Sequence, residues 1–140
     1  MTTLYPHGTI ARSTYFGSAE RDTGYAIAVA QDGDVYVAGL TGSDGLATTQ
    51  AFMTAQAGGF DGFVLRLSGS TVVWSSYLGG SGSDHPTDLA IDDDANIYVI
   101  GYTSSADFNV EGGFDATMDG GNDGVVTKIA QSDESPVTPG

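Results

Sequence analysis

The sequence of 140 residues contains no cysteine, so no disulfide bond stabilises the fold and no thiol chemistry is available. Basic residues are also scarce, because four lysines and arginines stand against 18 acidic residues, which gives a net charge of −14. A surface of this sign repels the phosphates of nucleic acids and of anionic membranes. We therefore expect neither among the partners of the protein, and cations are its natural counter-ions.

Long hydrophobic runs are absent as well. No stretch approaches the roughly 18 apolar residues of a membrane-spanning helix, so membrane insertion is not expected. Residues 1–7 lack the basic start and apolar centre of a signal peptide. The chain has only two histidines, His7 and His85, too few to build a transition-metal cluster within one chain.

What the sequence does contain is an internal repeat with an offset of 62 residues and no gap. Because a repeat unit buries its apolar face only against a neighbour, the repeat decides the architecture before any single residue does. Tyrosines that recur at equivalent positions are expected to pack between the units. The matched pairs include Ser13 and Ser75, Tyr15 and Tyr77, Gly17 and Gly79, Asp22 and Asp84, Tyr36 and Tyr98, Thr41 and Thr103, Ser43 and Ser105, Phe52 and Phe114, and Asp61 and Asp123.

Within each unit the hydrophobic residues follow the period of β-strands. The Asp/Gly cluster at 31–34 separates two short apolar runs and predicts a tight hairpin. Capped helical patterns are absent, although residues 46–56 leave room for one helical turn. We therefore predict an all-β fold with strands at 26–29, 35–39, 62–67 and 71–78, and with further strands at 89–91, 96–100 and 124–129.

Four short antiparallel strands make one blade of a β-propeller, so the sequence predicts two four-stranded blades. The expected division is an N-terminal extension at 1–8, a first repeat at 9–70, a second repeat at 71–130 and a flexible acidic, proline-containing tail at 131–140.

The repeat is offset relative to the blades. Residues 9–16 align with the fourth strand at 71–78, whereas the last strand at 124–129 aligns with a third strand. Unpaired strand edges are templates for pairing with another chain, so we expect head-to-tail self-assembly. The residues expected at this interface are Thr9, Ile10, Ala11, Arg12, Val125, Thr127 and Ile129.

The number of blades limits the assembly. A propeller ring closes with about 4–8 blades, so a trimer would supply six, a tetramer eight, and a contact that does not close would give a filament. The alternative is that the chain is excerpted from a longer array of blades.

Several spaced blocks stand out, namely Ser75-Ser76-Tyr77-Leu78-Gly79-Gly80, residues 96–105, Asp107-Phe108, and residues 58–67. Together these blocks resemble the SBBP repeats of bacterial and archaeal surface proteins. The chain departs from the family pattern by lacking a proline after Phe108 and by carrying Ala19-Glu20-Arg21 where Gly-Ser is usual. The resemblance implies a β-propeller module of extracellular or cell-surface proteins, mostly without an assigned activity.

One turn contains a candidate calcium site. Asp92, Asp94 and Asn96 occupy the first three oxygen-ligand positions of a calcium loop. The match then ends, because Ile97 replaces the turn glycine and Thr103 stands in place of the bidentate glutamate. The alternative interpretation is a hairpin turn, since Asp and Asn side chains readily bond nearby backbone groups. No other cofactor is indicated.

A catalytic site is not expected. Ser83, Asp84 and His85 are adjacent, but a nucleophile elbow needs a strand-to-helix turn, and the members of a triad come from separate elements. We therefore expect a structural or binding module, not an enzyme.

A glycan site is the remaining alternative. Trp74 and Tyr25 align with Arg12 and Thr87, so these two aromatics are not repeated and are candidates for ligand binding. They leave open a carbohydrate-binding or calcium-dependent surface-adhesion module as the second function.

Overall fold

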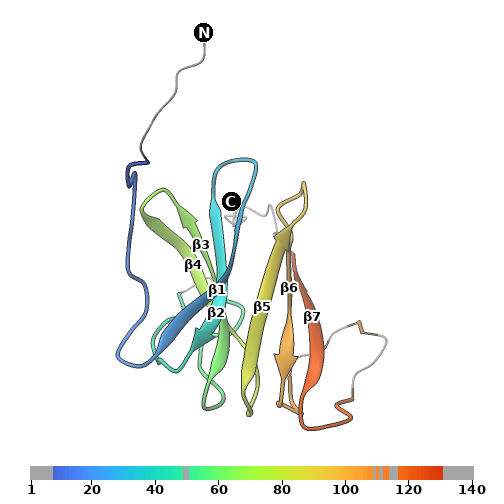
Figure 1. The fold of residues 1–140 in the computed structure, drawn as a ribbon. Helices are drawn as coiled ribbons and strands as arrows, with labels where there is room; N and C mark the ends of the chain where they lie inside the picture. Colours follow the sequence, from blue (N-terminus) through green and yellow to red (C-terminus); the bar gives the residue numbers. More distant parts are fainter. Residues whose placement is uncertain (1–7, 49–50, 109, 111, 114–116, 131–140) are drawn as a thin grey trace, which may run out of the picture.

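The computed structural model describes residues 8–48, 51–108, 110, 112–113 and 117–130 (Figure 1). They form an all-β fold, as predicted, and contain no helix that could cross a membrane. The helical turn that residues 46–56 could hold is not formed in the described part of that segment. The strands are β1 (Asp22–Val29), β2 (Val35–Thr41), β3 (Asp61–Ser68), β4 (Thr71–Leu78), β5 (Asp84–Ile91), β6 (Ile97–Thr103) and β7 (Asp123–Ile129).

The strands form two antiparallel sheets that stand side by side, as Figure 1 shows. The first sheet has the order β1-β2-β3-β4 and the second has the order β5-β6-β7. The prediction of two four-stranded blades is therefore correct for the first sheet, whereas the second has three strands among the described residues.

The segment at 9–16 does not form the predicted strand. It makes no hydrogen bond to any strand in the described part of the chain, and most of its side chains are exposed. The physical reason is the lack of a partner, because an extended segment becomes a strand only when a neighbouring edge pairs with it.

The two inner hairpins have equivalent turns. In the first, the Gly33 amide donates to the Ala30 carbonyl at 3.0 Å, and Gly33 adopts a φ of 92°. In the second, the equivalent Ala95 amide donates to the Asp92 carbonyl at 3.0 Å, and Ala95 has a φ of 63°. An alanine in this left-handed region is strained, so the second turn tolerates a cost that the first avoids with glycine.

Each sheet has a β-bulge in its first strand. The register shifts between Gly24 and Ala26 in β1 and between Pro86 and Asp88 in β5. The bulge brings the backbone close to a glycine of the next strand. A Cβ added at Gly39 would lie only 2.0 Å from the Thr23 carbonyl oxygen. The repeated glycine is required by this close approach.

The hydrophobic core is the seam between the sheets, where β1 and β2 pack against β5. Successive side chains of a strand point to opposite faces, so each sheet contributes only alternate residues to this seam. Burial of this apolar surface is the main force that holds the sheets together. The buried residues are Tyr36, Ala38, Val64, Trp74 and Leu78 from the first sheet, and Leu89, Ile97 and Val99 from the second.

Candidate interaction surfaces

Each sheet carries the same hydrogen-bonded cluster where its first strand begins. In the first sheet, Asp22 accepts hydrogen bonds from the Thr41 hydroxyl at 2.5 Å and from the Ser43 hydroxyl at 2.9 Å. Burial raises the pKa of Asp22, but the hydrogen bonds from Thr41, the Ser18 amide and Ser43 together lower it below its usual value of 3.8. The cluster explains why these residues recur in the sequence.

The second copy of this cluster accounts for Asp84. Its carboxylate accepts from Thr103 at 2.5 Å, from Ser105 at 3.0 Å and from the Gly80 amide at 2.9 Å. The neighbouring His85 ring stacks on Tyr102, with ring centroids 4.7 Å apart. Asp84 therefore holds a loop in place and does not orient His85 as a catalytic triad would require.

Asp61 also bonds loop backbone, and it does so in a fully buried position. Its carboxylate accepts from the Ala57 amide at 2.7 Å, while its second oxygen has no hydrogen-bond partner among the described residues. Burial, together with the negative charges of Asp84 and Asp107, raises the pKa of Asp61. The equivalent Asp123 accepts from the Asp119 amide at 2.8 Å.

The candidate calcium residues form a closed turn. The two carboxylate oxygens of Asp92 accept from the amides of Asp94 and Asn96, the Asn96 side chain and the Tyr98 hydroxyl, at 2.9 to 3.0 Å. The hydrogen bond from the Asn96 side chain, with these others, lowers the pKa of Asp92. No group of three acidic or histidine side chains suited to a metal occurs among the described residues. These contacts favour the hairpin-turn interpretation over the alternative, a calcium site with Asp92, Asp94 and Asn96 as ligands.

The two candidate ligand-binding aromatics lie in different environments. Trp74 is 8% exposed and packs edge-on between Tyr36 and Phe52, with centroids 6.4 and 6.2 Å away. Its ring is part of the core, so it offers no face to a ligand, which the sequence comparison with Arg12 did not reveal. Tyr25 is 50% exposed, at the bulge of β1.

Both sheets have an apolar outer face. Ile27 and Val29 of β1 are 68% and 66% exposed on the first sheet, and Ile100 and Val126 are 47% and 77% exposed on the second. The repeat relates these residues to buried ones: Ile27 corresponds to Leu89, Ile100 to Ala38, and Val126 to Val64. The outer face of each sheet is thus the counterpart of the face that the other sheet buries in the seam.

The predicted interface residues lie at the two ends of the molecule. Thr9, Ile10, Ala11 and Arg12 are exposed, whereas Val125, Thr127 and Ile129 alternate with exposed positions along β7 and are half-buried. Ile129 already packs against the core cluster. Ile27, Val29, Ile100 and Val126 are exposed apolar residues that the sequence pattern did not single out, because the pattern does not show which face of a strand is covered.

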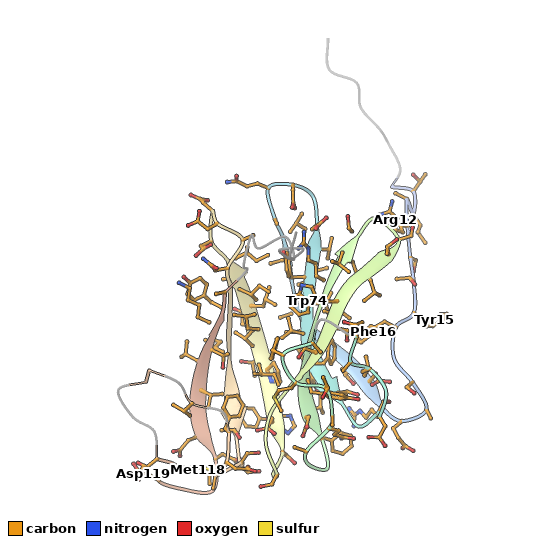
Figure 2. The ribbon with its side chains drawn as sticks, turned by 180° about the vertical axis from the view of Figure 1, so that it is seen from behind. Arg12, Tyr15, Phe16, Trp74, Met118 and Asp119 are labelled. Carbon is orange, nitrogen blue, oxygen red and sulfur yellow. The ribbon has the colours of Figure 1, made fainter. Side chains whose placement is uncertain are left out.

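Among the repeated residues, Tyr77 and Tyr15 differ most in the exposure of their side chains. Tyr77 is fully buried, donates its hydroxyl to the Ser43 carbonyl at 2.5 Å and accepts from the Leu46 amide at 3.1 Å. Its equivalent Tyr15 is fully exposed and points away from both sheets, as Figure 2 shows. Tyr77 is thus buried against the loop of its own sheet, and Tyr15 is exposed, so neither packs between blades; of the repeated tyrosines, Tyr36 lies in the seam between the sheets.

The comparison with protein families agrees with this geometry. The SBBP family, described as a beta-propeller repeat, matches residues 12–47 and 73–109, which together make up more than half of the chain. The chain belongs to the SBBP beta-propeller repeat family. No curated protein matches the sequence.

The limits of the two SBBP matches show how the repeat is divided between sheets. The second match begins in β4 of the first sheet and continues through β5 and β6 of the second. The first match begins at Arg12, inside the segment that belongs to no sheet, and continues through β1 and β2. A repeat in sequence therefore combines the last strand of one sheet with the first strands of the next.

Proposed function

We propose that this SBBP protein is a structural module that binds copies of itself head to tail, through the open faces and edges of its two sheets. The observation that carries this proposal is the match between exposed and buried faces. The exposed face with Ile27 and Val29 is the repeat equivalent of the face on which Leu89 and Ile91 pack into the seam. Likewise, the exposed face with Ile100 and Val126 is the repeat equivalent of the face on which Ala38 and Val64 pack into the seam.

A second copy fits these faces because the contact it would make already exists once in the molecule. The outer face of the second sheet in one copy would cover the outer face of the first sheet in the next, which reproduces the internal seam. Such a contact joins unlike surfaces, so it continues until it closes as a ring or extends as a filament. Exposed apolar faces of this kind are typical of interaction sites.

Binding, not catalysis, is the proposed role. The clusters with catalytic residue types, at Asp22 and Asp84, are occupied by hydrogen bonds that hold loops, and the equivalent clusters recur in both sheets. The contacts of Trp74 and Asp92 do not favour the glycan or calcium alternative. The extracellular or cell-surface location implied by the resemblance stays a prediction.

Light scattering over a concentration series, with and without calcium, tests the proposal. A discrete threefold or fourfold mass would support a closed ring, because about 4–8 blades complete a propeller. Growth without limit would support a filament, and a monomer at every concentration would contradict self-assembly. Ile27→Glu should prevent assembly, whereas Ser70→Glu, which adds the same charge in the exposed β3–β4 turn, should not.

A further inference from the structure

The second sheet lacks the strand that completes the first. In the first sheet, β4 pairs along the edge of β3, whereas β7, the equivalent of β3, pairs only with β6 in the described part of the chain. The residues equivalent to β4 are 9–16. We propose that residues 9–16 of one copy form the fourth strand of the second sheet of a neighbouring copy, where the Tyr15 hydroxyl anchors them; this rests on the self-assembly proposed above.

The donor must be another copy, because the chain cannot reach its own acceptor edge. Figure 1 shows the N-terminal segment beside the first sheet and β7 at the opposite side of the molecule. The segment is linked by only five residues to β1, whose strand lies in the first sheet. Pairing with β7 of the same chain would require β1 to leave that sheet.

The segment already lies where the last strand of a preceding blade would lie. The Phe16 ring packs on Phe63 of the outer face of the first sheet, with centroids 4.7 Å apart. Their repeat equivalents, Leu78 and Val125, line one cavity in the seam between the sheets. The pair Phe16 and Phe63 is thus the counterpart of two residues that line the complete seam.

The space beneath the segment is that of an incomplete seam. Tyr15, Phe16, Leu46 and Leu65 line a hollow of about 220 Å³ between the segment and the first sheet. The equivalent region of the complete seam, which is lined by Leu78, Phe108 and Thr127, retains only about 10 Å³. The three strands of a neighbour's second sheet would fill this difference.

Tyr77 shows how the anchor works. Its hydroxyl bridges the Ser43 carbonyl and the Leu46 amide, which ties β4 to the loop after β2. The equivalent loop atoms in the second sheet are the carbonyl of Ser105 and the amide of Phe108, and without a tyrosine between them they bond each other at 3.2 Å. Ser105 is 2% exposed, so an inserted hydroxyl would bond it out of water.

The register of the donated strand follows from the first sheet. There Phe63 lies opposite Tyr77, Val64 opposite Ser76, and Arg66 opposite Trp74. Transferred by the repeat, this register places Tyr15 opposite Val125, Thr14 opposite Val126, and Arg12 opposite Lys128 of the neighbouring copy. The last pair brings two like charges together, which weakens the junction.

Engineered cysteines test the register, since the chain contains none of its own. Directly opposite Cα atoms lie about 4.5 or 5.5 Å apart in antiparallel strands, within the range of a disulfide. Oxidised Thr14→Cys/Val126→Cys should give a ladder of covalent oligomers on a non-reducing gel. The control Thr14→Cys/Thr127→Cys, in which the second cysteine moves to the opposite face of β7, should give almost none.

The outcomes separate the two proposals. Suppose that the protein assembles in light scattering but neither double-cysteine variant cross-links, or both cross-link equally. Either result would overturn strand donation while leaving self-assembly in place. A chain that stays monomeric at every concentration would overturn both.

Tyr15→Phe tests the anchor without endangering the fold, because Tyr15 is fully exposed in the single chain. Loss of the hydroxyl removes the two hydrogen bonds that would tie the donated strand to the loop, so the dissociation constant should rise about 5- to 100-fold. Tyr25→Phe is the control, because its equivalent Thr87 stays exposed beside the complete seam. An unchanged dissociation constant for Tyr15→Phe would remove the anchor from the proposal.

Discussion

The two sheets carry the same pattern of side chains, but equivalent parts of them have different neighbours: β4 pairs with β3 and the second sheet covers the face that carries Val64, whereas β7 and the equivalent face of the second sheet are open among the described residues. Val64 and Val126 occupy equivalent positions, and they are 0% and 77% exposed. Tyr77 and Tyr15 are equivalent too, and they are 0% and 102% exposed. The difference teaches that an SBBP repeat encodes side chains for two neighbours, and that burial follows from whether each neighbour is present.

The largest effect is expected from a charge placed at equivalent valines. Val64→Asp would bury an unpaired carboxylate in the seam and should lower the free energy of unfolding by about 4 kcal/mol or more. Val126→Asp should leave the unfolding of the single chain within about 0.5 kcal/mol of the wild type, since this side chain is exposed. Urea unfolding of dilute protein measures both, and similar losses in the two variants would break the comparison.

The equivalent tyrosines should differ in the same sense by a smaller amount. Tyr77→Phe leaves the Ser43 carbonyl and the Leu46 amide without their partner, which should cost about 1–3 kcal/mol of unfolding free energy. Tyr15→Phe should not change the unfolding of dilute protein. Thermal denaturation followed by the tyrosine near-ultraviolet signal would measure the stability of both variants. An unchanged stability of Tyr77→Phe would show that the hydrogen bonds of the Tyr77 hydroxyl contribute nothing.

Two buried or partly buried aspartates of the first sheet should respond to pH with opposite signs. The pKa of Asp61 is raised, so its contribution to stability is complete below 3.8 and is lost as the pH rises through its folded-state pKa. The pKa of Asp22 is lowered, so its contribution is present above 3.8 and is lost as the pH falls through its folded-state pKa.

Substitution by asparagine separates these two effects. Relative to the wild type, Asp61→Asn should become more stable as the pH rises above 3.8, with a slope of at most about 1.4 kcal/mol per pH unit. Asp22→Asn should lose stability relative to the wild type over the pH range in which the native carboxylate is ionised. Urea titrations from about pH 2 to 7 measure the slopes, because the slope of Asp22→Asn lies below pH 3.8 and that of Asp61→Asn lies above it. Slopes of the same sign would contradict the assignment.

The smallest effect concerns the charges that the proposed register places opposite each other between copies. Arg12→Glu or Lys128→Glu should each tighten assembly about 1.5- to 5-fold, because the pair becomes attractive. The double variant should return towards the wild-type affinity, which a change in net charge alone would not produce. Arg21→Glu is the matched control, since its exposed side chain lies outside the register.

Much of the fold could be predicted from the sequence because it depends on local patterns. Alternating apolar residues and the turn at residues 31–34 located β1 and β2, and the offset of 62 residues carried the prediction to β5 and β6. The strand at Thr71–Leu78 was predicted with its observed ends. Bulges at Tyr25 and Thr87 extended β1 and β5 beyond the predicted limits, because a bulge interrupts the alternation on which the prediction relied.

The surfaces were harder to predict, since burial depends on contacts between distant parts of the chain. Trp74 was assigned to a ligand because no equivalent aromatic exists, but it fills a gap between Tyr36 and Phe52. Periodicity placed Ile27 and Val126 in strands and could not say which face lacks a neighbour. The segment at 9–16 has the pattern of a strand without the edge that would make it one.

The unlike ends of the molecule give any assembly a direction. In the proposed junction one end donates a strand and the other accepts it, so a copy truncated before Gly17 would keep its accepting edge at β7 and lose its donating segment. Such a copy could join one end of a growing chain of molecules and would prevent further addition beyond it. The shortened protein would therefore act as a chain terminator. At substoichiometric amounts it would limit the length of filaments, and it would prevent rings from closing.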